Sequence, residues 1–173
     1  TDSDAPTQDA PSQDSEASPD AEQPAGVDKT KLTVEEIDAA LETINPNFDP
    51  YDLDNGFATN CGHTSSILND TLNGAPVREA PGGSTLSLDQ MAAAAGRPQT
   101  TATPAQIEAS LRAAGEGAHC VVGVDRSTGT GHWFNAYFDG TDVWTLDAQT
   151  GTRSPWPPDE PNATYWDVSM DED

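Results

Sequence analysis

The chain has 173 residues, with 30 Asp and Glu against 7 Lys and Arg, so its formal net charge is -23 at pH 7. This charge excludes a nucleic-acid-binding surface as the default function, because phosphate recognition requires clustered cationic side chains. No apolar run approaches the about 18 residues of a membrane-spanning helix, so we expect a soluble protein. The chain begins Thr1-Asp2-Ser3, and we expect a processed product or a piece of a longer protein.

Acidic residues are concentrated at the two ends of the chain. Residues 1–28 contain eight Asp and Glu and no Lys or Arg, and a segment with so little apolar area cannot offset its backbone entropy on folding. We therefore predict a disordered acidic linker over residues 1–28. Residues 159–173 add six acidic side chains, and we interpret them as an acidic C-terminal extension with an edge strand at 165–170. Residues 29–158 remain as one domain with a single core.

Helix start and stop signals delimit four segments in the first two thirds of the chain. The first has a capping box, in which Thr33 caps the helix and Glu36 stands at the third helical position. Each segment ends at a glycine or, in the first, at Asn45-Pro46. We expect helices over residues 33–45, 61–74, 87–96 and 103–115.

Beyond the fourth helix the apolar pattern changes from a period of about 3.6 residues to a period of about 2, which is typical of strands. We expect strands over residues 121–125, 132–138, 143–147 and 165–170. Because the strands follow the helices, the sequence predicts an α+β fold in which N-terminal helices pack on an antiparallel sheet.

The two cysteines have different surroundings. Cys120 lies in an apolar strand and is expected in the core. Cys61 lies among polar, turn-forming residues at the start of a predicted helix, where unpaired backbone N–H groups and the helix dipole favour a thiolate. Leu68 and Leu72 follow it at helical spacing, so we expect the sulfur on the helix face that points toward the sheet.

The predicted hairpin brings a histidine and an acid together. A two-residue turn at Asp139-Gly140 would set His132 directly opposite Asp147, whereas a four-residue loop would set it opposite Gln149. Both registers keep the three side chains on one face of the sheet. A cysteine from the Cys61 helix, packed over that face, would complete a triad of cysteine, histidine and an orienting Asp or Gln.

Five sequence blocks carry a resemblance to a known family. They are Asn45-Pro46-Asn47-Phe48, Thr59-Asn60-Cys61, Leu72-Asn73-Gly74-Ala75-Pro76, Gly131-His132-Trp133-Phe134-Asn135-Ala136 and Leu146-Asp147-Ala148-Gln149-Thr150-Gly151. Together they resemble the papain-fold toxin family of bacterial polymorphic toxins, of the protein-glutamine deamidase type. The resemblance implies a papain-like cysteine-hydrolase fold, with Cys61 as nucleophile, His132 as base and Asp147 as orienting acid. It also implies that Gln149 lines the site.

The implied reaction is attack of the Cys61 thiolate on a glutamine side-chain amide of a target protein, followed by hydrolysis of the thioester. The Cys61 backbone N–H and one side-chain amide would hold the oxyanion, and the sequence leaves that amide open between Asn60, Asn55 and Gln149. We expect no metal and no organic cofactor. A papain-like cysteine peptidase or a transglutaminase would use the same triad, so both stay open as alternatives.

The resemblance also implies secretion or delivery into a target cell, a target-protein partner and a cognate immunity protein. A different class of function remains open on the charge alone. A net charge of -23 would speed association with cationic partners, as in a non-enzymatic nucleic-acid mimic or an immunity-type interaction protein.

Overall fold

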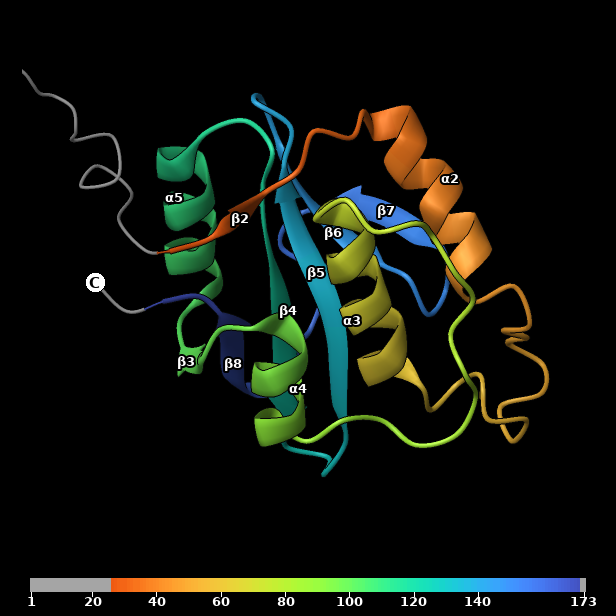
Figure 1. The fold of residues 1–173 in the computed structure, drawn as a ribbon. Helices are drawn as coiled ribbons and strands as arrows, with labels where there is room; N and C mark the ends of the chain where they lie inside the picture. Colours follow the sequence, from red (N-terminus) through yellow and green to blue (C-terminus); the bar gives the residue numbers. More distant parts are fainter. Residues whose placement is uncertain (1–25, 172–173) are drawn as a thin grey trace, which may run out of the picture.

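A computed structural model describes residues 26–171 of the chain (Figure 1). The linker predicted over residues 1–28 therefore lies outside the described residues, except for its last three positions. Those positions belong to the fold. Val27 is buried in the core, and Asp28 begins the short strand β2 (Asp28–Lys29), which pairs with the start of β4.

The four predicted helices are all present. The predicted capping box at Thr33 begins the first helix, and capping boxes at Ser87 and Thr103 begin two others. Cys61 is the first residue of the remaining helix. The helices are α2 (Val34–Ile44), α3 (Cys61–Leu72), α4 (Leu88–Ala95) and α5 (Pro104–Ala114).

The strands form one antiparallel sheet in the order β3-β8-β4-β5-β6-β7, with β2 also paired to β4. Its longer strands are β4 (Ala118–Arg126), β5 (Gly131–Phe138), β6 (Val143–Asp147) and β8 (Ala163–Ser169). Three strands were not predicted, because each has four residues or fewer and shows too little alternation: β2, β3 (Gln99–Thr101) and β7 (Thr152–Pro155). The α+β prediction is confirmed.

The strand predicted in the C-terminal extension is present as β8, but its expected place at the edge of the sheet is wrong. Strand β8 lies inside the sheet, between β4 on one side and β3 on the other. Its Val168 is fully buried in the core under α5. The partner β3 is only three residues long, too short for its pattern to predict that this edge of β8 would be covered.

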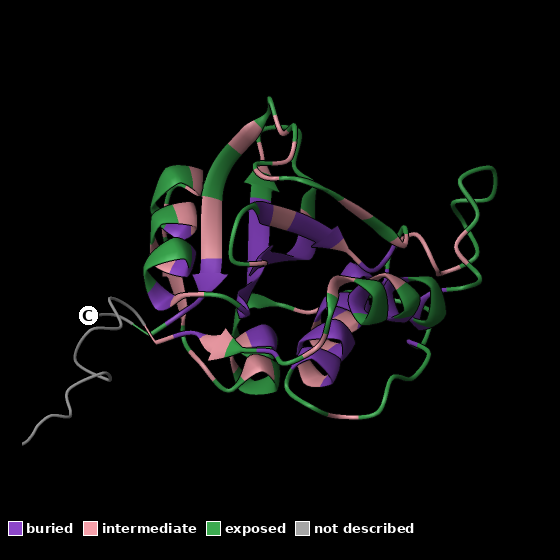
Figure 2. Ribbon diagram, turned by 90° about the horizontal axis from the view of Figure 1, so that it is seen from above, coloured by how far each residue is buried: buried purple, intermediate pink, exposed green. Residues whose placement is uncertain are grey.

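Helices cover both faces of the sheet. Helices α2, α3 and α4 pack on one face, and α5 packs on the other (Figure 1). Buried residues run along the central strands and along the helix sides that face them (Figure 2). Alternate residues of β5 serve the two cores: Phe134 belongs to the α5 core, whereas Tyr137 packs with α2 and α3.

Candidate active site

The hairpin between β5 and β6 has the four-residue loop. Asn135 pairs with Leu146 and Phe138 pairs with Val143, so the two-residue turn at Asp139-Gly140 is wrong. The Asp139 carboxylate accepts the backbone N–H groups of the next loop residues at 2.7 Å and so supports the wider loop. Both registers have the same parity, and His132 and Asp147 share a face as predicted.

Helix α3 does not pack over that face. Its Leu68 and Leu72 belong to the core that contains Tyr137 and Leu146. His132 lies instead on the side of Phe134, with the two ring centroids 5.6 Å apart. Cys61 therefore reaches the imidazole from the opposite face of the sheet, at a place where one edge of β5 has no paired strand.

The unpaired edge belongs to the first half of β5. The pairing between β5 and β6 begins at Asn135, and the first turns of α3 lie against the preceding backbone of β5. The Ser65 hydroxyl is 3.1 Å from the Phe134 carbonyl oxygen and 2.7 Å from Asn135 Oδ1, and Asn135 Nδ2 donates to the Ser65 carbonyl at 3.3 Å. The helix start thus takes the place of a paired strand, which puts Cys61 beside His132.

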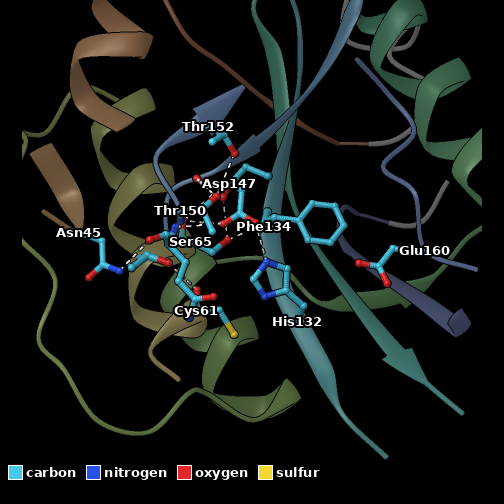
Figure 3. A network of polar contacts seen from close by, with 12 residues as sticks. Asn45, Cys61, Ser65, His132, Phe134, Asp147, Thr150, Thr152 and Glu160 are labelled. Carbon is cyan, nitrogen blue, oxygen red and sulfur yellow. Dashed lines mark hydrogen bonds and ion pairs between the residues drawn. The ribbon is translucent and has the colours of Figure 1, made fainter. Parts of the chain in front are cut away.

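His132 is held by a carboxylate. Its Nε2 lies 2.8 Å from Asp147 Oδ2, and Figure 3 shows the ring between Asp147 and Cys61. The other carboxylate oxygen accepts the backbone N–H groups of Gln149 at 3.1 Å and Thr150 at 3.4 Å. Asp147 therefore orients the imidazole and also starts the following turn. Because Nε2 is occupied, Nδ1 is the ring nitrogen left for the sulfur.

The charges of the cysteine and the histidine stabilise each other. Burial lowers the pKa of His132, but hydrogen bonds to Asp147 and Cys61 outweigh it and raise this pKa to about 10. Burial raises the pKa of Cys61, but His132, the Thr85 hydroxyl and the Trp133 backbone N–H together bring it below its ordinary value. Both shifts favour a thiolate on Cys61 beside an imidazolium on His132.

Two hollows meet at this pair, and both are lined by Cys61, Thr85, Gly131 and His132. The α4 hollow, about 220 Å³, extends toward the start of α4 and is also lined by Leu86, Ser87, Leu88, Gly123, Val124, Asp125, Trp133 and Asp167. The Asp147 hollow, about 590 Å³, is also lined by Ala58, Thr59, Arg126, Thr130, Asp147, Gln149, Thr150 and Glu160. A substrate can thus approach the sulfur although the Cys61 side chain is largely buried.

Asn60 was expected to line the site, and the structure places it elsewhere. It is fully buried and lines neither hollow. Its amide donates to Asn45 Oδ1 at 2.9 Å and to the Pro81 carbonyl at 3.0 Å. Both amide hydrogens are therefore used inside the protein, and Asn60 has none left for an oxyanion.

Gln149 is the expected amide that does line a hollow. Its Nε2 donates one hydrogen to Asn60 Oδ1 at 3.4 Å, which leaves a second hydrogen for a substrate. Asn45 Nδ2 donates to the Gln149 carbonyl at 2.8 Å and fixes its backbone. Asn55 lies in the exposed loop before α3 and lines neither hollow.

The second cysteine and its neighbour are core residues. Cys120 is 2% exposed, and burial raises the pKa of its thiol. His119 is equally buried, with Nε2 2.9 Å from Asn73 Oδ1, and burial lowers its pKa to about 4. Within residues 26–171, no group of three or more His, Cys, Asp or Glu side chains could hold a metal ion. In the same residues no helix is long and apolar enough to cross a bilayer.

Comparison with family models identifies the chain. The model described as papain fold toxin 1, glutamine deamidase, matches residues 59–152. The chain belongs to this family. The matched segment contains Cys61, His132 and Asp147, and membership confirms the resemblance and the papain-like fold. Searches of curated proteins and of solved structures found no match. The family name indicates a toxin with glutamine deamidase activity, an amidohydrolase type of enzyme that acts on a target protein.

Proposed function

We propose that this chain deamidates a glutamine side chain of a target protein through a thioester on Cys61, with His132 as acid and base and Asp147 as the orienting group. One observation carries the proposal. The Asp147 carboxylate holds His132 Nε2 at 2.8 Å, and the other side of the ring faces a cysteine at the start of a helix. These are the relations that a cysteine nucleophile and its base require.

The reaction follows from the charges of the resting pair. The Cys61 thiolate attacks the carbonyl carbon of the glutamine amide and forms a C–S bond. The C–N bond then breaks, and the imidazolium of His132 gives its proton to the departing nitrogen, which leaves as ammonia. The neutral imidazole takes a proton from water, whose oxygen attacks the thioester. The C–S bond breaks, glutamate is released, and the thiolate and imidazolium are restored.

The oxyanion of each tetrahedral intermediate needs two donors. The Cys61 backbone N–H is the first of α3 and has no acceptor within its own helix. The second hydrogen on Gln149 Nε2 is the candidate for the other donor, because Gln149 lines the Asp147 hollow together with Cys61. The buried amides of Asn45 and Asn60 hold Gln149 for this role.

The biological role follows from the family. The toxin would enter a recipient cell, modify its target there, and be neutralised in the producing cell by a cognate immunity protein. We further propose that the catalytic unit extends over residues 26–171 rather than 29–158, because Val27 and β8 both contribute to the core.

The test is to produce the parent chain, Cys61→Ala and Cys120→Ala in bacterial cells, and to measure growth and the intact mass of cellular proteins. We expect the parent to inhibit growth and to add about one dalton per modified glutamine, because OH replaces NH2. Cys61→Ala should stay folded and lose the activity by about 10³-fold or more. Cys120→Ala is the matched control and should keep it.

Other outcomes would identify another function. A shortened target would indicate a peptidase, and a target that gains an amine would indicate a transglutaminase. Full growth inhibition by a folded Cys61→Ala protein would contradict any cysteine chemistry and would favour a non-enzymatic acidic interaction protein.

A further inference from the structure

Thr85 lies beside the candidate nucleophile, and no spacing in the sequence pointed to it. It lies in the segment between α3 and α4 and lines both hollows. Its Oγ1 is 3.3 Å from Cys61 Sγ and 2.9 Å from the backbone nitrogen of Gly62. The hydroxyl therefore contacts the sulfur and the start of the helix at the same time.

The direction of these two hydrogen bonds is fixed by their chemistry. The Gly62 N–H can only donate, so Thr85 Oγ1 is the acceptor of that bond. The hydroxyl keeps its own hydrogen, and the Cys61 sulfur is the acceptor within reach. A thiolate has no hydrogen to give, so in the ionised pair Thr85 must be the donor.

Thr85 also replaces the ordinary cap of α3. Asn60 occupies the N-cap position but makes no side-chain cap bond, because its Oδ1 accepts from Gln149 Nε2 and its Nδ2 donates to Asn45 and Pro81. The Gly62 N–H is one of the helix donors without a partner in its own helix, and Thr85 satisfies it from 23 residues away. The position of the hydroxyl is thus tied to the position of the helix that carries the sulfur.

The approach of Thr85 depends on the glycine at position 62. A Cβ there would lie 2.7 Å from Thr85 Oγ1 and 2.5 Å from the Leu86 backbone nitrogen, closer than real Cβ contacts allow. The same segment is anchored at its other side, where the Trp133 indole donates to the Leu86 carbonyl at 2.9 Å. The hydrogen bond from the Gly62 N–H and the hydrogen bond from the Trp133 indole therefore both hold the Thr85 hydroxyl near the sulfur.

We propose that Thr85 is a further catalytic residue, whose hydroxyl accepts the Gly62 N–H and donates its hydrogen to the Cys61 thiolate. It stabilises the attacking thiolate, and it stabilises the same thiolate again when the sulfur departs from the thioester. This inference rests on the proposed function only in taking Cys61 as the nucleophile. Thr85 is also among the groups that lower the pKa of Cys61 against the effect of burial.

The test compares Thr85→Val, which keeps the shape and removes the hydroxyl, with Thr85→Ser, which restores it. The rate of Cys61 alkylation by iodoacetamide is measured against pH in full-length protein. We expect Thr85→Val to raise the midpoint by about 0.5 to 1 pH unit, which slows alkylation by about 3- to 10-fold below the midpoint. Thr85→Ser should stay within about 0.2 unit of the parent.

Thr59→Val is the matched control. Among the described residues, the Thr59 hydroxyl bonds the carbonyls of Gly83, in the same segment as Thr85, and of Gly56, and it makes no hydrogen bond to the sulfur. We expect this variant to leave the midpoint unchanged. An unchanged midpoint in Thr85→Val, or an equal rise in Thr85→Ser or Thr59→Val, would overturn the proposal, because the effect would then be absent or would come from displacement of the segment.

A measurement on the parent protein covers the case in which Thr85→Val does not fold. The Thr85 ¹³Cβ chemical shift should titrate with the midpoint found for Cys61 alkylation, and a shift that does not move at that pH would overturn the proposal. Neither experiment uses deamidase activity. A toxic Cys61→Ala protein would therefore defeat the proposed function while leaving the contact between Thr85 and Cys61 to be decided by the titration.

Discussion

The molecule contains two cysteine and histidine pairs, and their differences separate burial from chemistry. Cys120 and His119 are neighbours in β4, whereas Cys61 and His132 come from α3 and β5. Both cysteines are largely buried, at 2% and 6% exposure. Burial is the largest influence on the first pair, so the pKa of Cys120 is raised and the pKa of His119 is lowered to about 4.

In the second pair the same burial is outweighed by polar partners. Asp147 and the cysteine itself raise the pKa of His132 to about 10 against desolvation, and His132, Thr85 and Trp133 lower the pKa of Cys61. The comparison shows that a helix start and an oriented ring, rather than exposure, distinguish the candidate nucleophile from a core thiol.

The largest effect beyond loss of the nucleophile is expected at Asp147. Asp147→Ala removes the acceptor of His132 Nε2, and we expect kcat to fall by about 10³-fold. Asp147→Asn keeps only one of the two acceptor oxygens, which serve His132 Nε2 and the backbone N–H groups of Gln149 and Thr150, and we expect a loss of about 10³-fold or more. In both variants the pKa of His132 should fall, so the alkaline limb of the pH-rate profile should move to lower pH. If Asp147→Ala were as active as the parent, the proposed role of Asp147 in orienting His132 would be contradicted.

A smaller effect is expected at Gln149. Gln149→Ala removes the amide hydrogen proposed for the oxyanion, and we expect kcat to fall by about 10²-fold. The alkylation midpoint of Cys61 should not change, because the amide makes no contact with the sulfur in the resting site. Asn55→Ala is the control and should retain parent activity. A loss in Asn55→Ala that exceeds the loss in Gln149→Ala would reverse this assignment.

The smallest expected effect concerns stability at the core pair. His119 is neutral in the fold because burial lowers its pKa to about 4. The unfolded chain binds a proton near pH 6.5, so stability falls as pH drops from about 6.5 to about 4. His119→Gln has no side chain that takes up a proton in this range. Its free energy of unfolding, measured by urea titration at pH 7 and at pH 4.5, should therefore fall less than that of the parent, by up to about 3 kcal/mol. Identical pH dependence in the two proteins would contradict the neutral buried histidine.

The sequence predicted those parts of the fold that depend on neighbouring residues. Capping boxes located the helices because a cap and its helix lie within four residues. It predicted that His132 and Asp147 would share a face of the sheet, because strand parity is independent of loop length. The hairpin register was left open, since it depends on how Asp139 bonds the loop.

The sequence did not predict how α3 meets the sheet. That arrangement depends on Ser65 and Asn135, which are 70 residues apart and bond only after the fold has formed. For the same reason the sequence did not predict the contact of Thr85 with Cys61 or the position of Asn60 away from the site. Their partners are fixed by tertiary contacts, and no local spacing encodes them.

The most direct test of the account is a competition between the two thiols. Iodoacetamide at low concentration and neutral pH should label Cys61 well before Cys120, with an apparent pKa for Cys61 below the about 8.5 of a free thiol. Peptide mapping of the folded parent protein locates the label. Preferential labelling of Cys120, or a Cys61 thiol that titrates at or above the value of a free cysteine, would contradict the thiolate on which the proposed chemistry depends.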